Sequence, residues 1–332
     1  MLNGKNILIT GGTGSFGKKF LEMTFARYNP NKVIIYSRDE FKQSVMKMEY
    51  ADKVDMSKVR FFIGDVRDKE RLYRAFEGVD YVIHAAAMKQ VPTCEYNPFE
   101  AIKTNIHGAQ NVIDAALDRG VKKVVALSTD KAVNPINLYG GTKLVSDKLF
   151  IAANAYSGKK DTRFSIVRYG NVAGSRGSII PIFNNIINRG EKVLPITDYR
   201  MTRFWITLEQ GVELVFKALE ESKGGETYIS KIPSFRITDL AKALLPDAEL
   251  KEIGIREGEK LDEVMVTKDD SRRAYEYDKH YIVYPNFEWM DLNKTLLPGG
   301  KLVEEGFEYN SGKNNVWLSV EDLKRELAKL NF

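Results

Sequence analysis

The stretch Ile7-Leu-Ile-Thr-Gly-Gly-Thr-Gly-Ser-Phe-Gly17 decides the fold that we expect for this chain. Its apolar start predicts a buried parallel strand, and a helix is predicted directly after the glycines. The G-x-x-G-x-x-G spacing allows a tight turn and a close approach of the backbone to a pyrophosphate, which the free amides of the helix N-terminus attract. The stretch therefore predicts a dinucleotide site, with contacts from Gly11, Thr13, Gly14, Ser15, Phe16 and Gly17.

Strands and helices alternate from this loop to about residue 170. Short apolar runs predict strands at 6–10, 32–37, 59–64, 80–86, 122–127 and 162–169. Helical spacing of apolar residues predicts helices at 15–27, 41–48, 69–76, 98–119 and 139–156. This order indicates an α/β protein with a Rossmann-type, doubly wound parallel sheet covered on both faces.

The pattern changes after Tyr169, where Gly, Ser and Pro cluster. Later elements are shorter: the sequence predicts helices at 208–221, 237–245 and 320–330, a strand at 227–230 and a loop-rich stretch at 253–266. We therefore predict two interleaved domains. The dinucleotide-binding domain takes 1–170 and about 204–230, and a smaller C-terminal substrate domain takes 171–203 and 231–332.

Composition narrows the function classes. The chain has 332 residues, of which 43% are hydrophobic and 29% charged, as in soluble globular proteins. A net charge of +5 without a basic tail argues against nucleic-acid binding. One cysteine and three scattered histidines argue against disulfides and a metal site. Neither a signal peptide nor a membrane-spanning apolar run is evident, so we expect a cytoplasmic protein.

The end of the second predicted strand indicates which dinucleotide binds. Arg38 follows Ser37 there and suits the 2′-phosphate of NADP, whereas Asp39 would suit the ribose hydroxyls of NAD. The sequence favours NADP and leaves NAD open. Other residues expected around the cofactor are Ser37, Lys42, Asp65, Val66, Ala85 and Ala87.

A tyrosine and a lysine four residues apart open the long helix at 139–156. The spacing places Tyr139 and Lys143 on one helix face. A tyrosine with a pKa near 10 acts as a base at neutral pH only beside a positive charge, which Lys143 supplies. Thr129, Asp130 and Lys131 directly follow the fifth strand, at the sheet edge where ligands of such folds bind.

These motifs together resemble the extended short-chain dehydrogenase/reductase family. Within it, Thr129-Asp130-Lys131-Ala132 is similar to the UDP-N-acetylglucosamine 4,6-dehydratases, whereas enzymes acting on nucleoside diphosphate glucose carry Thr-Asp-Glu. Arg168-Tyr-Gly-Asn-Val172, Met201-Thr-Arg-Phe-Trp-Ile-Thr207 and Gly254-Ile-Arg-Glu-Gly-Glu-Lys-Leu261 resemble the inverting members, which serve pseudaminic acid synthesis. The resemblance implies UDP-N-acetylglucosamine as substrate, NADP as cofactor and a homo-oligomer, with a hexamer as one option.

The resemblance also implies roles. Tyr139 would deprotonate the 4-hydroxyl with Lys143 beside it, Asp130 would protonate the leaving 6-hydroxyl, and Lys131 would remove the C5 proton. A lysine with a pKa near 10.4 is a base only when neutral, so Lys131 as an orienting group stays open. Residues expected at the substrate or the nicotinamide are Lys89, Thr129, Asn171, Val172, Arg203 and Arg256.

Two departures from the family pattern and three rival functions stay open. Gln90 and Asp262 each stand where the family carries histidine. A UDP-sugar 4-epimerase shares the loop and the Tyr-x-x-x-Lys pair but needs no acid–base pair at 130–131. A 5-retaining dehydratase shares Thr-Asp-Lys. A non-enzymatic NADP-sensing Rossmann protein commonly lacks the Tyr-x-x-x-Lys pair that this chain retains.

Overall fold

The main sheet fixes where the site lies. The computed structural model describes residues 1–158, 160–174, 178–287 and 295–330. Ten strands form one sheet in the order β15-β13-β14-β9-β6-β5-β4-β1-β2-β3, parallel from β9 to β3 and antiparallel from β9 to β15. Their bounds are β1 Asn6–Thr10, β2 Lys32–Ser37, β3 Val59–Ile63, β4 Tyr81–His84, β5 Lys123–Thr129, β6 Arg163–Tyr169, β9 Thr227–Ser230, β13 Ala274–Glu276, β14 His280–Val283 and β15 Lys301–Leu302.

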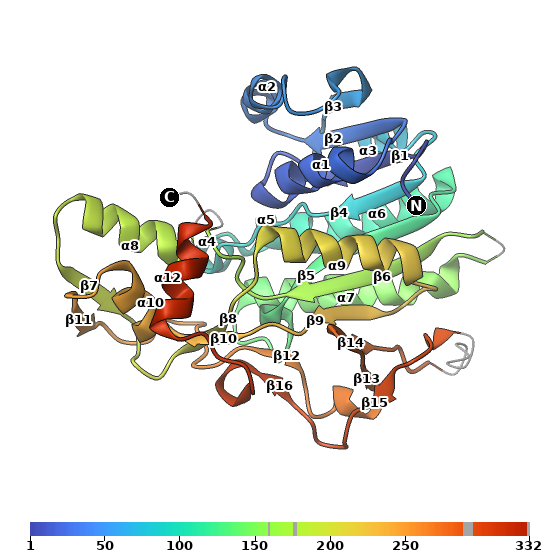
Figure 1. Cartoon of the computed structure of the whole chain (residues 1–332). Coiled ribbons are helices and arrows are strands. Elements are labelled where there is room, and N and C mark those ends of the chain that lie inside the picture. Colours follow the sequence, from blue (N-terminus) through green and yellow to red (C-terminus); the bar gives the residue numbers. More distant parts are fainter. Residues whose placement is uncertain (159, 175–177, 288–294, 331–332) are drawn as a thin grey trace.

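Helices cover both faces of this sheet. Alternation of side chains along β1 sends Ile7 and Ile9 into one apolar cluster and Leu8 into another. Helices α1 and α9 pack together on the first face, and α3, α6 and α7 pack on the second (Figure 1). The helices around the sheet are α1 Ser15–Arg27, α2 Glu40–Glu49, α3 Lys69–Ala75, α4 Val91–Tyr96, α5 Pro98–Ile102, α6 Gly108–Arg119, α7 Leu138–Tyr156 and α9 Leu208–Glu221.

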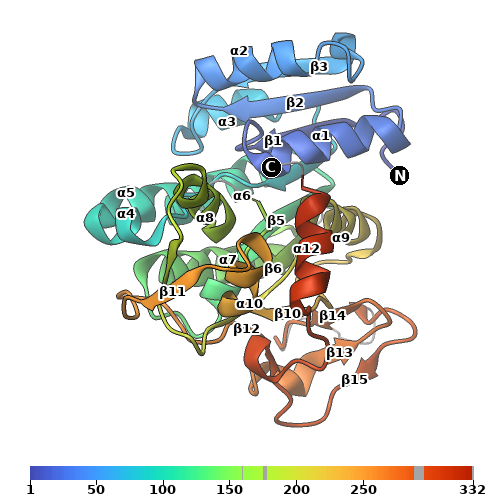
Figure 2. The same cartoon turned by 60° about the vertical axis from the view of Figure 1, so that its left-hand side comes forward.

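A smaller lobe lies beside the carboxyl ends of the parallel strands, where α8, α10 and α12 lie together (Figures 1 and 2). Its apolar core contains Phe183, Leu194, Trp205, Leu240 and Leu323. Short strands pair as β10–β8, β11–β7 and β12–β16. The bounds here are α8 Ile179–Asn188, α10 Ile237–Leu244, α12 Val320–Ala328, β7 Val193–Ile196, β8 Thr202–Phe204, β10 Ser234–Arg236, β11 Glu249–Glu252, β12 Val264–Val266 and β16 Tyr309–Asn310.

The structure confirms the predicted Rossmann-type α/β fold, and its strand order from β3 to β6 is that of the dinucleotide-binding sheet. The helix expected at 98–119 is interrupted by a π-helical turn, η2 (Lys103–His107). The stretch expected to be loop-rich at 253–266 ends in β12. Three strands from the range assigned to the substrate domain extend the main sheet, and the division into two domains stays a prediction. No helix in the described ranges combines the length and apolar character needed to cross a bilayer.

Candidate active site

The glycine loop is shaped to admit a diphosphate. Gly11 has φ +66°, and a Cβ there would lie 2.9 Å from the backbone of Ala86 at the end of β4. A Cβ on Gly17 would lie 2.3 Å from the carbonyl oxygen of Gly12, so α1 packs directly on the loop. Helix α1 starts at Ser15 with no acidic residue in its first turn. The amides and dipole of this helix N-terminus suit a pyrophosphate, and the predicted contacts with a dinucleotide stay a prediction.

The turn after β2 carries the residues that the sequence predicts at the adenosine end of the cofactor. Asp39 accepts a hydrogen bond from Lys42 N and caps α2, and its carboxylate pairs with Lys42 Nζ at 2.9 Å. Both contacts hold the pKa of Asp39 below its ordinary value. Arg38 is largely exposed, with Nη1 3.7 Å from Asp65 Oδ2. Ser37 Oγ lies 3.0 Å from Thr13 Oγ1, which ties the glycine loop to the end of β2.

Small or apolar residues stand after the carboxyl ends of β3, β4 and β6. Val66 packs against Gly108, where a Cβ would lie 2.8 Å from Val66 Cγ2. Phe16 stacks on Tyr169 with ring centroids 6.4 Å apart. The sequence-predicted cofactor residues on these strand ends are Ala85 and Ala87 after β4 and Val172 after β6, the last forming a β-bridge with Ile206.

The first turn of α7 is pressed against the end of β5. Asn137 caps this helix, accepting from Gly140 N at 2.7 Å. A Cβ on Gly140 would lie 2.1 Å from the carbonyl oxygen of Lys131, so only glycine allows this contact. Burial raises the pKa of Tyr139 to about 12, opposed by the charge of Lys131 and a hydrogen bond with Thr129. The structure thus brings the tyrosine to the Thr-Asp-Lys segment.

Lys143 and its neighbours form the first of two buried lysine clusters. Lys143 and Asp147 are 3% and 2% exposed and lie one helical turn apart on α7. Ser128 Oγ donates to Asp147 Oδ2 at 2.5 Å, and Arg168 Nη2 lies 3.9 Å from that oxygen. Burial lowers the pKa of Lys143, while the charge of Asp147 opposes that shift. Asp147 therefore helps to keep the buried lysine charged.

Lys131 is the centre of the second cluster. Its Nζ lies 3.1 Å from Asp130 Oδ1, 3.1 Å from Asn171 Oδ1 and 3.3 Å from Glu263 Oε1. Burial lowers the pKa of Lys131, but the charges of Asp130 and Glu263 outweigh burial and raise it above its ordinary value. Asp130 is 1% exposed, and its Oδ2 has no hydrogen-bond partner among the described residues. The Asp130 carboxylate therefore has one oxygen in contact with the Lys131 ammonium and one without a partner, and the two residues form an acid–base pair.

Arg203 belongs to the same cluster. Its Nε lies 3.7 Å from Glu263 Oε1, and its Nη1 donates to the carbonyl oxygens of Thr202 and Leu261. Arg203 is buried on β8, so most of its donors serve the protein itself. The expectation that Arg203 binds the substrate stays a prediction.

The sequence analysis missed two residues of the site. Glu263 is separated by 132 positions from Lys131, so nothing in the sequence around Lys131 pointed to it. Asn105, in the π-helical turn, accepts from Met88 N at 2.8 Å and donates to Met88 O and to Thr142 Oγ1. It thereby fastens the loop after β4 to α7. A π-turn is often found at a functional site, but it is not legible in sequence.

The other predicted substrate residues and the two departures from the family pattern have the following surroundings. Desolvation and the charge of Lys131 lower the pKa of Lys89. Arg256 is exposed, with Nη1 3.9 Å from Glu259 Oε1. Of the two departures from the family pattern, Gln90 accepts from Thr93 Oγ1 and Asp262 accepts from Thr202 Oγ1. Neither contacts the Tyr139, Lys143 or Lys131 side chains through a hydrogen bond.

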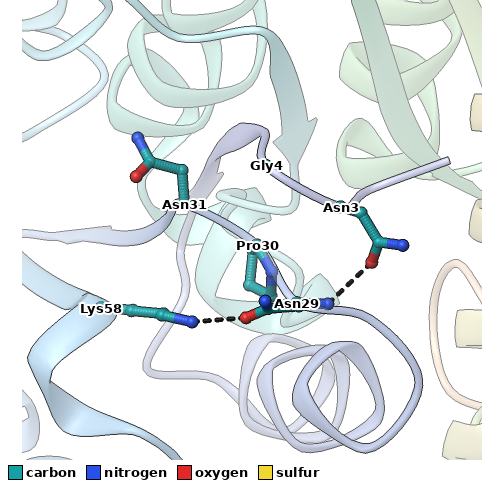
Figure 3. Close-up of a pocket in the computed structure, with 6 residues that line it drawn as sticks. All are labelled: Asn3, Gly4, Asn29, Pro30, Asn31 and Lys58. Carbon is teal, nitrogen blue, oxygen red and sulfur yellow. Dashed lines mark hydrogen bonds between the residues drawn. The ribbon is translucent and has the colours of Figure 1, made fainter.

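A surface hollow lies at the opposite edge of the sheet. It is lined by residues that precede β1, β2 and β3, with Asn29 bonded to Lys58 and to Asn3 (Figure 3). It holds no acid–base pair and lies at the amino ends of the strands, away from the glycine loop. Across the described ranges, no group of His, Cys, Asp and Glu could hold a metal ion.

Comparison with known proteins places this geometry in a family. Residues 7–285 match the family described as polysaccharide biosynthesis protein. The chain is 57% identical to the inverting UDP-N-acetylglucosamine 4,6-dehydratase of Campylobacter jejuni, over 97% of each chain. It is 41% identical to the UDP-glucose 4-epimerase of Rickettsia canadensis, over 99% of this chain and 96% of that one. The X-ray structure of Pen from Bacillus thuringiensis has a TM-score of 0.91 at 39% identity and covers 100% of this chain and 99% of that one. The chain therefore belongs to the polysaccharide biosynthesis proteins of the extended short-chain dehydrogenase/reductase family.

Proposed function

We propose that this chain is an NADP-dependent UDP-N-acetylglucosamine 4,6-dehydratase that inverts C5. The product is UDP-2-acetamido-2,6-dideoxy-β-L-arabino-hex-4-ulose, and the reaction opens pseudaminic acid synthesis in the cytoplasm. One observation carries the proposal: the Tyr139–Lys143 pair and the Asp130–Lys131 pair meet at the end of β5. An oxidation base and an acid–base pair for elimination thus share one site. The 57% identity to a dehydratase of that name supports the substrate.

The cofactor is a nicotinamide dinucleotide, and we assign it as NADP. The glycine loop and α1 would hold its diphosphate. Asp39, the residue that would bind ribose hydroxyls in an NAD enzyme, is already committed to capping α2. Arg38 extends from the same turn with most of its side chain exposed, and a guanidinium suits a 2′-phosphate. When bound, the nicotinamide supplies a hydride acceptor for C4 and returns the hydride at C6.

Tyr139 takes the proton of the 4-hydroxyl as C4 becomes a ketone. Its pKa near 12 means that the phenolate needs help, which the charge of Lys131 and the hydrogen bond with Thr129 give. We assign Lys143, one helical turn away on the same face, the same role. The 4-ketone makes the C5 hydrogen acidic. Lys131 then takes the C5 proton while Asp130 gives a proton to the departing 6-hydroxyl, so that water leaves. A proton returned to the opposite face of C5 inverts that centre, and the whole reaction is redox-neutral.

The acid and the base of this elimination exchange a proton within their own contact. In the resting site Lys131 is held as a cation by two carboxylates. Movement of one proton along the 3.1 Å contact from Lys131 Nζ to Asp130 Oδ1 would yield a neutral amine and a neutral acid together. Those are the forms that the elimination requires.

Product analysis tests the proposal. Purified protein is incubated with UDP-N-acetylglucosamine in deuterated water and followed by NMR. We expect a 4-keto-6-deoxy sugar with inverted C5 that carries deuterium there. Formation of the C5-retained sugar instead would assign the 5-retaining dehydratase activity.

A second test addresses the cofactor. Arg38→Ala should weaken NADP binding about 10- to 100-fold, because a charge-assisted hydrogen bond contributes about 1.5–3 kcal/mol, and should leave NAD binding almost unchanged. Isothermal titration with each dinucleotide measures both. Equal losses for NAD and NADP would contradict the 2′-phosphate assignment.

The identity to Rickettsia proteins named UDP-glucose 4-epimerase favours a second candidate function. An epimerase would use the same glycine loop, Tyr139 and Lys143 but would return the hydride to C4. Release of UDP-N-acetylgalactosamine without any 6-deoxy product would establish it. The buried acid–base pair at Asp130 and Lys131 would then have no chemical use, which is why we place the dehydratase first.

A further inference from the structure

We infer that Glu263 is a positioning residue of the dehydration step: its carboxylate holds the ammonium of Lys131 and sets the pH at which Lys131 takes the C5 proton. This role rests on the proposed function. It adds a residue that lies far from the Thr-Asp-Lys segment in sequence and directly follows Asp262, one of the two departures from the family pattern.

The geometry around Lys131 is that of a fully bonded ammonium. A lysine ammonium has three N–H donors. Three oxygens lie 3.1–3.3 Å from Nζ, supplied by Asp130, Asn171 and Glu263. Asp130 and Asn171 follow β5 and β6 of the main sheet, whereas Glu263 directly precedes β12. A segment outside the main sheet thus supplies the third oxygen.

The backbone of Glu263 is anchored on both sides by Ser311. Its backbone N donates to Ser311 Oγ, and its carbonyl oxygen accepts from Ser311 N, each at 2.9 Å. Glu263 is 2% exposed, whereas the Lys131 side chain is 21% exposed. Lys131 is therefore the member of the pair that a substrate reaches, and Glu263 acts through it.

The surrounding charges define the electrostatic effect of Glu263. Asp130, Lys131, Arg203 and Lys260 face its carboxylate. Burial and Asp130 raise the pKa of Glu263, and the three cations oppose that shift. The charge of Lys131 in turn acts to lower the pKa of Tyr139 and of Lys89. Without the Glu263 charge, Lys131 would keep Asp130 as its one carboxylate partner among the described residues.

The test is the pH dependence of deuterium loss from C5-deuterated UDP-N-acetylglucosamine. Removal of the C5 deuterium needs only the neutral amine of Lys131 and not the acid, so its rate should rise with pH until Lys131 is neutral and then level. In Glu263→Gln the levelling should occur at least about one pH unit lower, since an opposite charge within 4–6 Å shifts a pKa by about 1–3 units. The maximal rate should fall about tenfold or more, because the amine is a weaker base. The C5 kinetic isotope effect should rise.

Matched variants separate charge from packing. Glu263→Asp keeps the charge and should keep the wild-type pH profile at a reduced rate. Glu249→Gln removes an exposed carboxylate from β11 and should change neither rate nor profile. Arg203→Gln removes a cation that faces Lys131 and should move the levelling to higher pH, which tests the assignment even where Glu263→Gln does not fold.

Each result decides between the two proposals. A wild-type protein that forms no 4-keto-6-deoxy sugar contradicts the proposed function and the Glu263 role with it. An active wild-type enzyme whose Glu263→Gln variant levels at the wild-type pH contradicts the Glu263 role alone. So does a Glu263→Asp variant that shifts as far as Glu263→Gln.

Discussion

The surroundings of two lysines in the site, the buried Lys143 and the half-buried Lys131, shift their pKa values in opposite directions. Lys143 has one acidic neighbour, Asp147, on its own helix, and burial lowers its pKa. Lys131 has two carboxylates within 3.3 Å, and its pKa rises in spite of burial. Within a single site, the pKa of one lysine is thus lowered and the pKa of the other is raised. The number of carboxylates in contact, more than depth of burial, decides the direction.

The difference assigns the two lysines to different steps. A lysine next to the tyrosine on one helix face serves the oxidation at C4. A lysine that can pass a proton to a neighbouring carboxylate serves the elimination across C5 and C6. Substitutions in the two clusters should therefore interrupt the reaction at different points.

The largest effect is expected from Lys143→Met, which replaces the buried cation by an apolar chain of similar length. Oxidation at C4 should fall about 10²–10⁴-fold, because Tyr139 loses the charge that makes it a base. Borodeuteride quenching should then place no deuterium at C4. Lys148→Met, an exposed position on the same helix, is the control and should react normally. Normal C4 labelling in Lys143→Met would remove the distinction between the lysines.

Lys131→Met should stop the reaction one step later. Product formation should fall about 10²-fold or more, as expected for a lost general base, while oxidation at C4 continues. Borodeuteride quenching should yield a sugar labelled at C4 that still carries its C6 oxygen. Retained exchange at C5 with solvent would show that Lys131 orients the site and that another group is the base.

Asp147→Asn tests the cause of the Lys143 charge. Lys143 acts as a cation, so its function is present below its pKa and lost above it. Removing the Asp147 charge lowers that pKa further, and the alkaline limb of C4 oxidation should move down by about one pH unit. The pH profile of borodeuteride labelling measures the shift. An unmoved limb would mean that Ser128 and Arg168, rather than Lys143, are the partners that matter to Asp147.

A further prediction concerns stability behind the Lys143 cluster. Burial, with a contribution from Lys143, lowers the pKa of His84 from 6.5 to about 3. Stability from the neutral histidine is complete above pH 6.5 and is lost as pH falls toward 3. The loss should reach about 3 kcal/mol near pH 4, at about 1.4 kcal/mol per unit.

Denaturant unfolding at several pH values measures this loss. His84→Asn keeps a polar group near Thr10 Oγ1 but does not titrate, so its stability should fall less between pH 7 and pH 4. Parallel losses in the two proteins would show that His84 is not held neutral.

Much of the fold could be predicted from the sequence because it depends on local pattern. Apolar runs and glycines at 7–17 predicted β1, the loop and α1 within a residue or so, since strand and helix periods are local properties. The Tyr139–Lys143 pair could be predicted for the same reason. The strands β13, β14 and β15 could not be placed from the sequence, because two to four residues of pattern cannot show which sheet a strand joins.

The sequence by itself determined the Rossmann sheet, the glycine loop and the helix face that carries Tyr139 and Lys143. Only the tertiary structure decided that Asp39 caps a helix, that Gly140 meets the carbonyl of Lys131, and that Arg203 and Glu263 join the lysine cluster. The physical reason is the distance along the chain over which each effect acts. Periodicity and capping act over a few residues, whereas the charge that sets a pKa comes from whatever the fold brings within a few ångströms, here a carboxylate 132 positions away.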